Sequence, residues 1–317
     1  MDWNTLWHGL GWPLCRLMFF ISLGLLIGNL IEALNWTRAV ARVAEPITRI
    51  AHLKDITGAS FSMAFFSGVT ANTMLAEAHE QGKLSDKELM ISNLFNSLPT
   101  YFLHMPTLFF ITVPFIGKAA AVYVGLTLCA AFLRTLFIIG LGRLALPPLE
   151  PGCVPCRLEE HASTDWNAAL RKTWMRFKKR IRKITRITIP IFVAIFFLKR
   201  YGAFEALEGF LGAHVSIFSW LPAEALSIVV FHVAAEFTAG LATAGALLQG
   251  GSLGVREIVL ALLLGNVLSS PMRALRHQFP YYAGIFRPKQ ALKLIAANQT
   301  LRVCSIIFVG VVYYFVG

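Results

Sequence analysis

Charged residues are scarce in this sequence, and acidic ones are scarcer still. Of its 317 residues, 15% are Asp, Glu, Lys or Arg and 56% are hydrophobic, with 17 acidic residues against 29 lysines and arginines. The mean hydropathy is +0.62. A soluble domain carries about 25% charged residues, so the composition excludes an ordinary soluble protein. Uncharged runs that approach about 20 residues instead predict an all-α, polytopic helical membrane protein.

Several familiar catalytic motifs are also missing. The sequence has no HExxH zinc motif, no GxxxxGK[ST] phosphate-binding loop and no paired-aspartate motif. Each of these motifs supplies the groups that its reaction needs, so metallopeptidase and P-loop nucleotide chemistry have no site here. We therefore expect no enzyme and no cofactor.

Cysteine is rare as well, with five in the chain. Only Cys153 and Cys156 have a spacing typical of metal or redox sites, and there is no second pair to complete a four-cysteine zinc site. On the topology given below the pair faces a reducing cytoplasm, which disfavours a structural disulfide. We expect two ordinary loop cysteines and keep a metal or redox role as the weaker alternative.

What the sequence does contain is one order of landmarks that occurs twice, in residues 66–106 and 237–280. Each copy begins with small residues around a glycine, passes a polar break and a glutamate, and continues into an apolar run that an Asn/Ser/Pro cluster interrupts. The spacing from Gly68 to Pro99 equals the spacing from the corresponding glycine to Pro271. This duplication predicts two related membrane halves.

We expect three parts: a first membrane half over residues 1–144, a linker over residues 145–186 and a second membrane half over residues 187–317. The linker begins with prolines and ends in a basic amphipathic segment. Crossing helices are predicted at residues 13–34, 58–76, 118–144, 187–201, 224–248 and 290–316. The runs at residues 89–117 and 257–286 are predicted to be re-entrant hairpins or broken helices.

The basic linker sets the expected orientation. Much of the net charge of +12 lies there, and the positive-inside rule and anionic lipid headgroups explain it without a nucleic-acid partner. With the linker in the cytoplasm and an odd number of crossings per half, the halves are inverted repeats and both termini lie outside. An even number of crossings per half stays open as an alternative.

Polar residues flank both interruptions of the apolar runs. Freed backbone groups in a membrane must lie inside protein or line a polar cavity, and paired broken segments point to the binding site of a transporter. Asparagine and serine offer neutral donors and acceptors to a solute, or cap half-helix ends. The residues expected to line the site are Asn72, Asn93, Asn96, Ser97, Asn266, Ser269 and Ser270.

Ionisable residues within predicted spans are further candidates. His232 and Glu236 are four residues apart and would share one face of a helix. They could form a proton or cation site, a metal site, or a buried pair whose side chains hydrogen-bond to each other. Arg134 and Arg302 occupy matching positions in the last span of each half. We favour a structural ion pair for them, with Glu236 as one partner, over contact with a substrate anion. Arg273, Arg276 and His277 give the second interruption a basic mouth or, in the favoured interpretation, form a basic edge that anchors it at the cytoplasmic side of the membrane.

The small-residue turn, the Gly-x-Leu-Ser/Gly-x-x-Glu helix start and the Asn/Ser/Pro interruption resemble the Gate, or nucleoside-recognition, domain family over residues 15–145 and 185–316. That family includes the membrane region of the FeoB ferrous-iron transporters and spore maturation proteins A and B. The resemblance implies an integral protein of a prokaryotic cytoplasmic (inner) membrane. It departs at the glycine turns, residues 68–73 and 240–245, which have no cysteine to meet iron.

Together these features predict a secondary transporter or permease for a small polar solute, nucleoside-like or an organic anion. The solute would bind near the bilayer midplane between the two repeats, with alternating access and H⁺ or Na⁺ as coupling ion. The lipid bilayer is the other expected partner, and a homo-oligomer stays open. One alternative is a divalent-metal permease, in which His232, Glu236 and His104 or His277 converge. The other is a non-transporting accessory membrane protein with a packed centre.

Overall fold

The computed structural model describes residues 3–12, 14–15, 18–19, 22, 26, 44–148, 166–201, 220–235, 237–274, 278–279, 282 and 285–317. All regular structure in these residues is helical. Three stretches of the described chain are long and apolar enough to cross a membrane, namely Asp86–Ile116, Lys118–Ala145 and Pro288–Val316. These findings agree with an all-α membrane protein.

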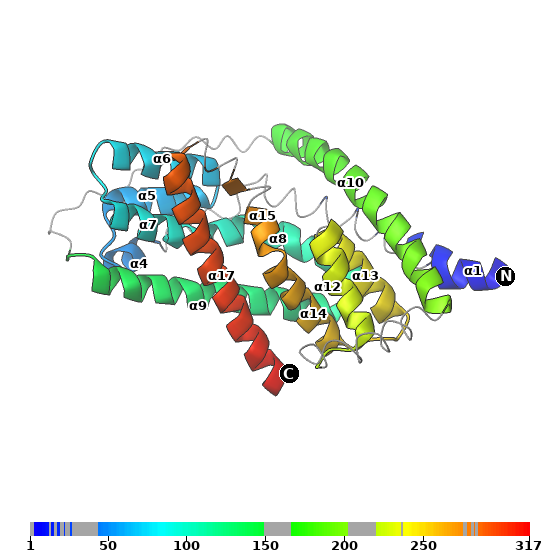
Figure 1. Cartoon of the computed structure of the whole chain (residues 1–317). Coiled ribbons are helices and arrows are strands. Elements are labelled where there is room, and N and C mark those ends of the chain that lie inside the picture. Colours follow the sequence, from blue (N-terminus) through cyan, green and yellow to red (C-terminus); the bar gives the residue numbers. More distant parts are fainter. Residues whose placement is uncertain are drawn as a thin grey trace.

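The first membrane half contains a hairpin of two short helices, α5 (Asp55–Ala64) and α6 (Gly68–Glu80). The chain folds back after α5, so that the Ser60 hydroxyl donates a 2.9 Å hydrogen bond to the Ala71 carbonyl. Figure 1 shows the two helices side by side. The prediction of one crossing helix over residues 58–76 is therefore wrong. Its small residues let two arms of a hairpin approach each other.

The second half repeats this arrangement with α12 (Ala223–Ala235) and α13 (Phe237–Gln249). Gly240 of α13 faces α12 so closely that a Cβ atom there would lie 2.8 Å from Cβ of His232. A glycine is needed at this crossing because any side chain would displace the facing helix. The prediction of a single crossing helix over residues 224–248 is wrong for the same reason as in the first half.

Each hairpin is followed by an interrupted helix. The four segments are α7 (Asp86–Phe95), α8 (Ser97–Ile116), α14 (Val255–Leu268) and α15 (Ser270–Arg273). Asn96 separates the first pair and Ser269 the second. Pro99 and Pro271 lie in the first turn after each interruption, where a missing N–H frees a carbonyl in the preceding helix. Helices α7 and α8 together are long and apolar enough to cross a membrane. Residues 89–117 therefore form a broken helix, and the re-entrant hairpin is not confirmed.

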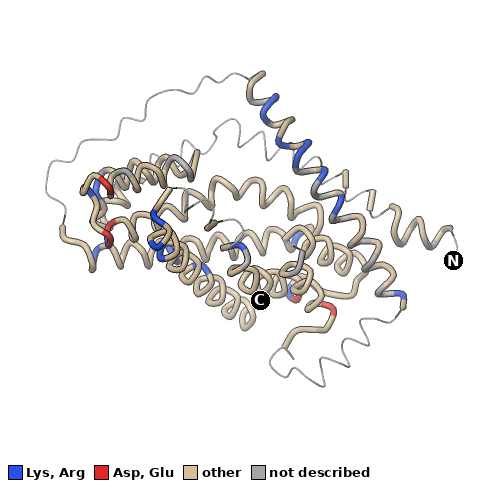
Figure 2. Tube along the Cα trace, turned by 45° about the horizontal axis from the view of Figure 1, so that its top comes forward, with Lys and Arg blue, Asp and Glu red and all other residues tan. Residues whose placement is uncertain are grey.

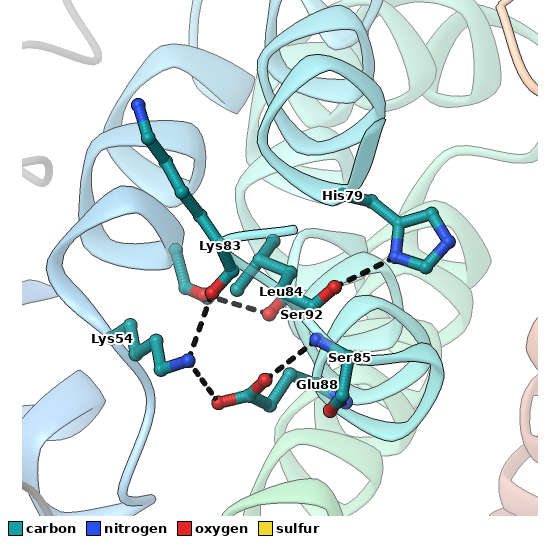
Figure 3. Close-up of polar contacts among 8 residues, drawn as sticks. Lys54, His79, Lys83, Leu84, Ser85, Glu88 and Ser92 are labelled. Atoms are coloured by element: carbon teal, nitrogen blue, oxygen red, sulfur yellow. Dashed lines mark hydrogen bonds and ion pairs between the residues drawn. The ribbon is translucent and has the colours of Figure 1, made fainter. Parts of the chain in front are cut away.

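The start of α7 is fixed by local contacts. The Ser85 hydroxyl accepts a 3.3 Å hydrogen bond from the Glu88 backbone N–H, and the Glu88 carboxylate accepts a 2.7 Å bond from the Ser85 N–H. Such a capping box satisfies two N–H groups that a helix start leaves free. Lys54 adds a 2.8 Å ion pair to Glu88 and a 2.8 Å hydrogen bond to the Lys83 carbonyl (Figure 3). The first hairpin is thereby tied to the interrupted helix.

Two long helices, α9 (Lys118–Ala145) and α17 (Pro288–Val316), pack against each other and cross near the middle of the molecule (Figure 1). Gly117 alone connects α8 to α9, with φ at +51°. That conformation favours glycine and allows α9 to reverse and pack along α8. Each half therefore has the same order of elements: hairpin, interrupted helix, long helix.

Four further helices complete the described part: α1 (Trp3–Leu6), η1 (Trp7–Gly11, a π-helix), α4 (Ala44–Ile50) and α10 (Trp166–Arg200). Helix α10 runs without interruption through the expected border at residues 186 and 187. The basic segment of the linker and the expected crossing helix at 187–201 are thus one helix. Lysines and arginines follow each other along its first part (Figure 2), and it packs on α13.

The main core joins the two halves. It combines buried residues of α8 and α9 with those of α12, α13, α14 and α17. Gly245 of α13 lies so close to α8 that an added Cβ atom would be 2.9 Å from the Phe115 carbonyl oxygen. Small residues at such crossings let helix backbones approach within the bilayer.

Some expected elements fall outside the described residues. They are most of the span at 13–34 and residues 149–165 of the linker. Glu236 and the cysteine pair, Cys153 and Cys156, also lie outside the described part of the chain.

Candidate functional site

A polar cavity of about 770 Å³ lies where the two halves meet. Its walls come from both hairpins, both interrupted helices and both long helices. Ligand sites typically measure about 300–1,000 Å³, so a small organic solute fits this volume. Eight residues from the sequence-predicted site line the cavity: Asn72, Asn93, Asn96, Ser97, Arg134, Asn266, Ser269 and Arg302.

The first interruption presents neutral amides to the cavity. Asn93 Nδ2 donates to Asn72 Oδ1 at 2.9 Å and to the Tyr282 hydroxyl at 3.3 Å. Asn96 Nδ2 donates to Ser60 Oγ at 2.7 Å. The side-chain oxygens of Asn93 and Asn96 are buried and have no hydrogen-bond partner among the described residues. This wall is therefore neutral, and the two amide oxygens lie beneath the surface that faces the cavity.

The second interruption is organised around Asn266. Its Oδ1 accepts hydrogen bonds from Nη2 of Arg302 at 2.7 Å and Nη2 of Arg273 at 3.3 Å. Its Nδ2 donates to the Tyr123 hydroxyl at 3.0 Å. Because arginine only donates, these contacts fix which way the amide points. The Ser270 hydroxyl donates to the Asn266 backbone carbonyl at 2.9 Å, so Ser270 supports the interruption without lining the cavity.

The matching arginines of the two long helices bond to the interruption of their own half. Arg134 is 8% exposed and donates from Nε to Ser97 Oγ at 3.2 Å, whereas Arg302 donates to Asn266. Within the described residues the ion pairs involve neither arginine. The predicted structural ion pair is therefore not found in this part of the chain, and Glu236, its expected partner, lies outside it.

Three arginines, Arg134, Arg273 and Arg302, line the cavity. Arg273 also donates to Ser269 Oγ at 2.9 Å. None of the described residues that line the cavity is Asp or Glu. A buried charge is costly unless it is paired and hydrogen-bonded, so the described walls favour an anion.

His232 lies in a narrow space between two glycines. It is 2% exposed, and an added Cβ on Gly265 of α14 would lie 2.5 Å from its Nδ1, while Gly240 of α13 contacts it from the other side. Its Nε2 lies 3.4 Å from Ser269 Oγ. Gly265 therefore makes room for the imidazole ring, and the landmark Gly240 makes room for the Cβ atom and backbone of the same histidine.

The metal candidates do not form a cluster in the described part of the chain. His232 and His104 both line the cavity, but no group of three or more His, Cys, Asp or Glu residues within the described ranges could hold a metal ion. Glu236 lies outside those ranges, and helix α12, which carries His232, ends at Ala235. Cys153, Cys156 and His277 lie outside them too.

Sequence reasoning missed an aromatic part of the wall. Tyr101, Tyr123 and Tyr282 line the cavity. Tyr123 stacks on Phe237 with 5.9 Å between ring centroids. The spacing of residues on α9 could have predicted part of this wall. One face of that helix carries four residues that line the cavity, namely Tyr123, Thr127, Ala130 and Arg134.

Arg273 was interpreted as part of a basic edge, and the structure places it in the cavity instead. Residues 250–254 also match the GxSxG spacing of a nucleophile elbow, which sequence reasoning overlooked. That motif works on a sharp turn from a strand into a helix. Here it connects helices α13 and α14, and its serine does not line the cavity. It gives no support to a hydrolase site.

Comparison with known proteins finds relatives of similar length whose functions are undescribed. Uncharacterized protein MJ1556 of Methanocaldococcus jannaschii is 26% identical over 289 residues, which cover 89% of both chains. Uncharacterized proteins MJ0871 and MJ0880 of the same organism are each 24% identical, over 93% and 92% of this chain and 91% and 94% of their own. No family model and no solved structure matches the chain. The functional argument therefore starts from the cavity.

Proposed function

We propose that this protein is a secondary transporter or permease that binds a small polar solute in the central cavity. The observation that carries this proposal is the convergence of both interrupted helices on one cavity of about 770 Å³. A polar space of this size at the junction of two halves is what a solute site requires.

The order of elements supports alternating access. Hairpin, interrupted helix and long helix occur in the same order in each half, as expected for inverted repeats that meet around a midplane site. Each half contributes one interruption, at Asn96 or Ser269, and one arginine from its long helix. Rocking of one half against the other would open the cavity to either side in turn, with the basic linker in the cytoplasm.

The other two readings receive less support. A divalent-metal permease would place a cation next to Arg134, Arg273 and Arg302, whose charges repel it. An accessory protein with a packed centre would fill the space between the interruptions with apolar side chains. The polar lining and the volume of the cavity favour a solute site over both.

Uptake into proteoliposomes tests the proposal. Purified protein is reconstituted and supplied with nucleosides, organic anions and divalent metals, each labelled. We expect uptake of at least one solute, and a loss of most uptake when Asn96→Leu and Asn266→Leu are combined. Asn167→Leu, on the exposed side of α10, is the matched control and should transport normally. Unchanged uptake in the double variant would show that the solute does not pass through this cavity.

A further inference from the structure

The cavity has an excess of positive charge in its described walls. Arg134, Arg273 and Arg302 line it, and no described lining residue is acidic. Their hydrogen-bond acceptors are all neutral: Ser97 Oγ for Arg134, Ser269 Oγ and Asn266 Oδ1 for Arg273, and Asn266 Oδ1 for Arg302. Neutral acceptors orient guanidinium groups without balancing their charge.

Two of the three arginines lie close enough to share one ligand. Nη2 of Arg302 and Nη2 of Arg273 lie 2.7 and 3.3 Å from the same Asn266 oxygen. The two nitrogens are therefore no more than about 6 Å apart, a span that the oxygens of one carboxylate or phosphate group reach with ordinary hydrogen bonds. Arg134 lines the same cavity.

Most donors of these arginines form no hydrogen bond with the described residues. A guanidinium group has five N–H donors. The hydrogen bonds to described residues use Nε of Arg134 and one Nη2 atom each of Arg273 and Arg302. The remaining N–H groups match the paired, planar geometry by which arginine recognises carboxylate and phosphate.

We propose that the cavity binds a small organic anion, with its carboxylate or phosphate group held by Arg134, Arg273 and Arg302. Its uncharged part lies toward the neutral wall formed by Asn72, Asn93 and Tyr282. This assignment rests on the proposed function and specifies its substrate class. The 770 Å³ volume is larger than an inorganic oxyanion needs, which favours an organic one.

Thermal stabilisation of the purified protein in detergent tests the binding step without transport. The probes are uridine monophosphate, succinate and inorganic phosphate, with uridine and choline as neutral and cationic counterparts at equal ionic strength. Uridine and its monophosphate differ only in the phosphate group. We expect the anions to raise the melting temperature in a saturable way and uridine and choline to leave it unchanged. The succinate and phosphate arms show whether carboxylate or phosphate is preferred.

Charge-removing variants locate the site. Arg302→Gln and Arg273→Gln should each weaken the affinity for the best anion by about tenfold or more, as expected for loss of a charge-assisted contact. Arg143→Gln is the control. It removes an exposed charge near the C-terminal end of α9 and should leave the affinity for the anion unchanged. If Arg302→Gln fails to fold, Arg273→Gln alone decides.

The outcomes separate this inference from the permease function. Equal stabilisation by uridine and its monophosphate, no stabilisation by any anion, or normal affinity in the arginine variants overturns the anion site. Anion binding without uptake into proteoliposomes supports the anion site and contradicts the permease. Uptake of a neutral solute without anion binding supports the permease and contradicts the anion site.

Discussion

Replacing Asn266 with leucine removes the hydrogen-bond acceptor that two half-buried arginines share. In the wild-type protein Asn266 Oδ1 accepts from Arg302 at 2.7 Å and from Arg273 at 3.3 Å, and Nδ2 donates to the Tyr123 hydroxyl at 3.0 Å. Leucine has the same branching and number of side-chain heavy atoms but forms none of these bonds. Hydrogen bonds to charged groups contribute about 1.5–3 kcal/mol each. The sum of the two arginine bonds therefore estimates how much free energy of unfolding the substitution removes.

The expected loss in the free energy of unfolding is about 3 kcal/mol, at the low end of that sum. Arg273 keeps its bond to Ser269 Oγ, and water in the cavity replaces part of the lost hydrogen bonding. A loss of this size lowers the melting temperature by roughly 5 °C or more in a protein of this length. The assay is thermal unfolding of the purified protein in detergent.

Asn298→Leu is the matched control for this substitution. Asn298 lines the same cavity but forms no side-chain hydrogen bond with the described residues, so the change should cost less than about 1 kcal/mol. Asn266→Asp keeps the acceptor and adds a negative charge beside Arg273 and Arg302. It should stabilise the empty protein and weaken anion binding. Equal melting temperatures for Asn266→Leu and wild type, or an equal loss in Asn298→Leu, would refute the role given to Asn266.

Two more predictions concern packing and helix capping. Gly265→Ala places a Cβ atom 2.5 Å from His232 Nδ1 and should cost about 2 kcal/mol or more, whereas Gly125→Ala, with open space around it, should be neutral or stabilise by up to about 1 kcal/mol. Equal effects in thermal melts would argue against the close approach of α12 and α14. Ser85→Ala removes the capping hydroxyl that accepts from the Glu88 N–H and should cost about 1 kcal/mol. A melt unchanged from wild type would mean that the capping box does not stabilise α7.

The features that sequence predicts well are those set by local chemistry. Helix starts follow from Ser85 and Glu88, whose side chains bond to backbone groups three residues away. Helix interruptions follow from Pro99 and Pro271, since a missing N–H acts on its own helix in any fold. The membrane environment follows from composition. Because the interruptions were predicted, the polar residues beside them could be listed as neighbours before their contacts were known.

The two hairpins could not be predicted from local patterns. An apolar run of about 20 residues at 58–76 or 224–248 has the length of a crossing helix, and only tertiary contacts show that it folds back. Those contacts are the Ser60 bond to the Ala71 carbonyl and the approach of Gly240 to His232. Small residues permit both arrangements, so composition did not distinguish them.

The electrostatics of the cavity could not be predicted from the sequence either, because it depends on contacts between residues that are far apart in the chain. The matching positions of Arg134 and Arg302 were visible in the sequence, but their partners were not. A buried arginine suggests a carboxylate partner, yet the described partners are Ser97 and Asn266. Arg273 enters the cavity because Ser269 interrupts the helix just before it. The excess of positive charge therefore emerges from three separate helices, which no local pattern links.

The most direct test of the central claim measures whether the cavity opens to both sides of the membrane. Asn298→Cys places a thiol in the cavity wall, in a background where the five native cysteines are replaced by alanine. Oriented vesicles are treated from one side or the other with a membrane-impermeant, anionic thiosulfonate reagent. We predict modification from both sides, slowed in each case by an anion that binds the cavity. Modification from one side only, or from neither, would contradict alternating access to this site.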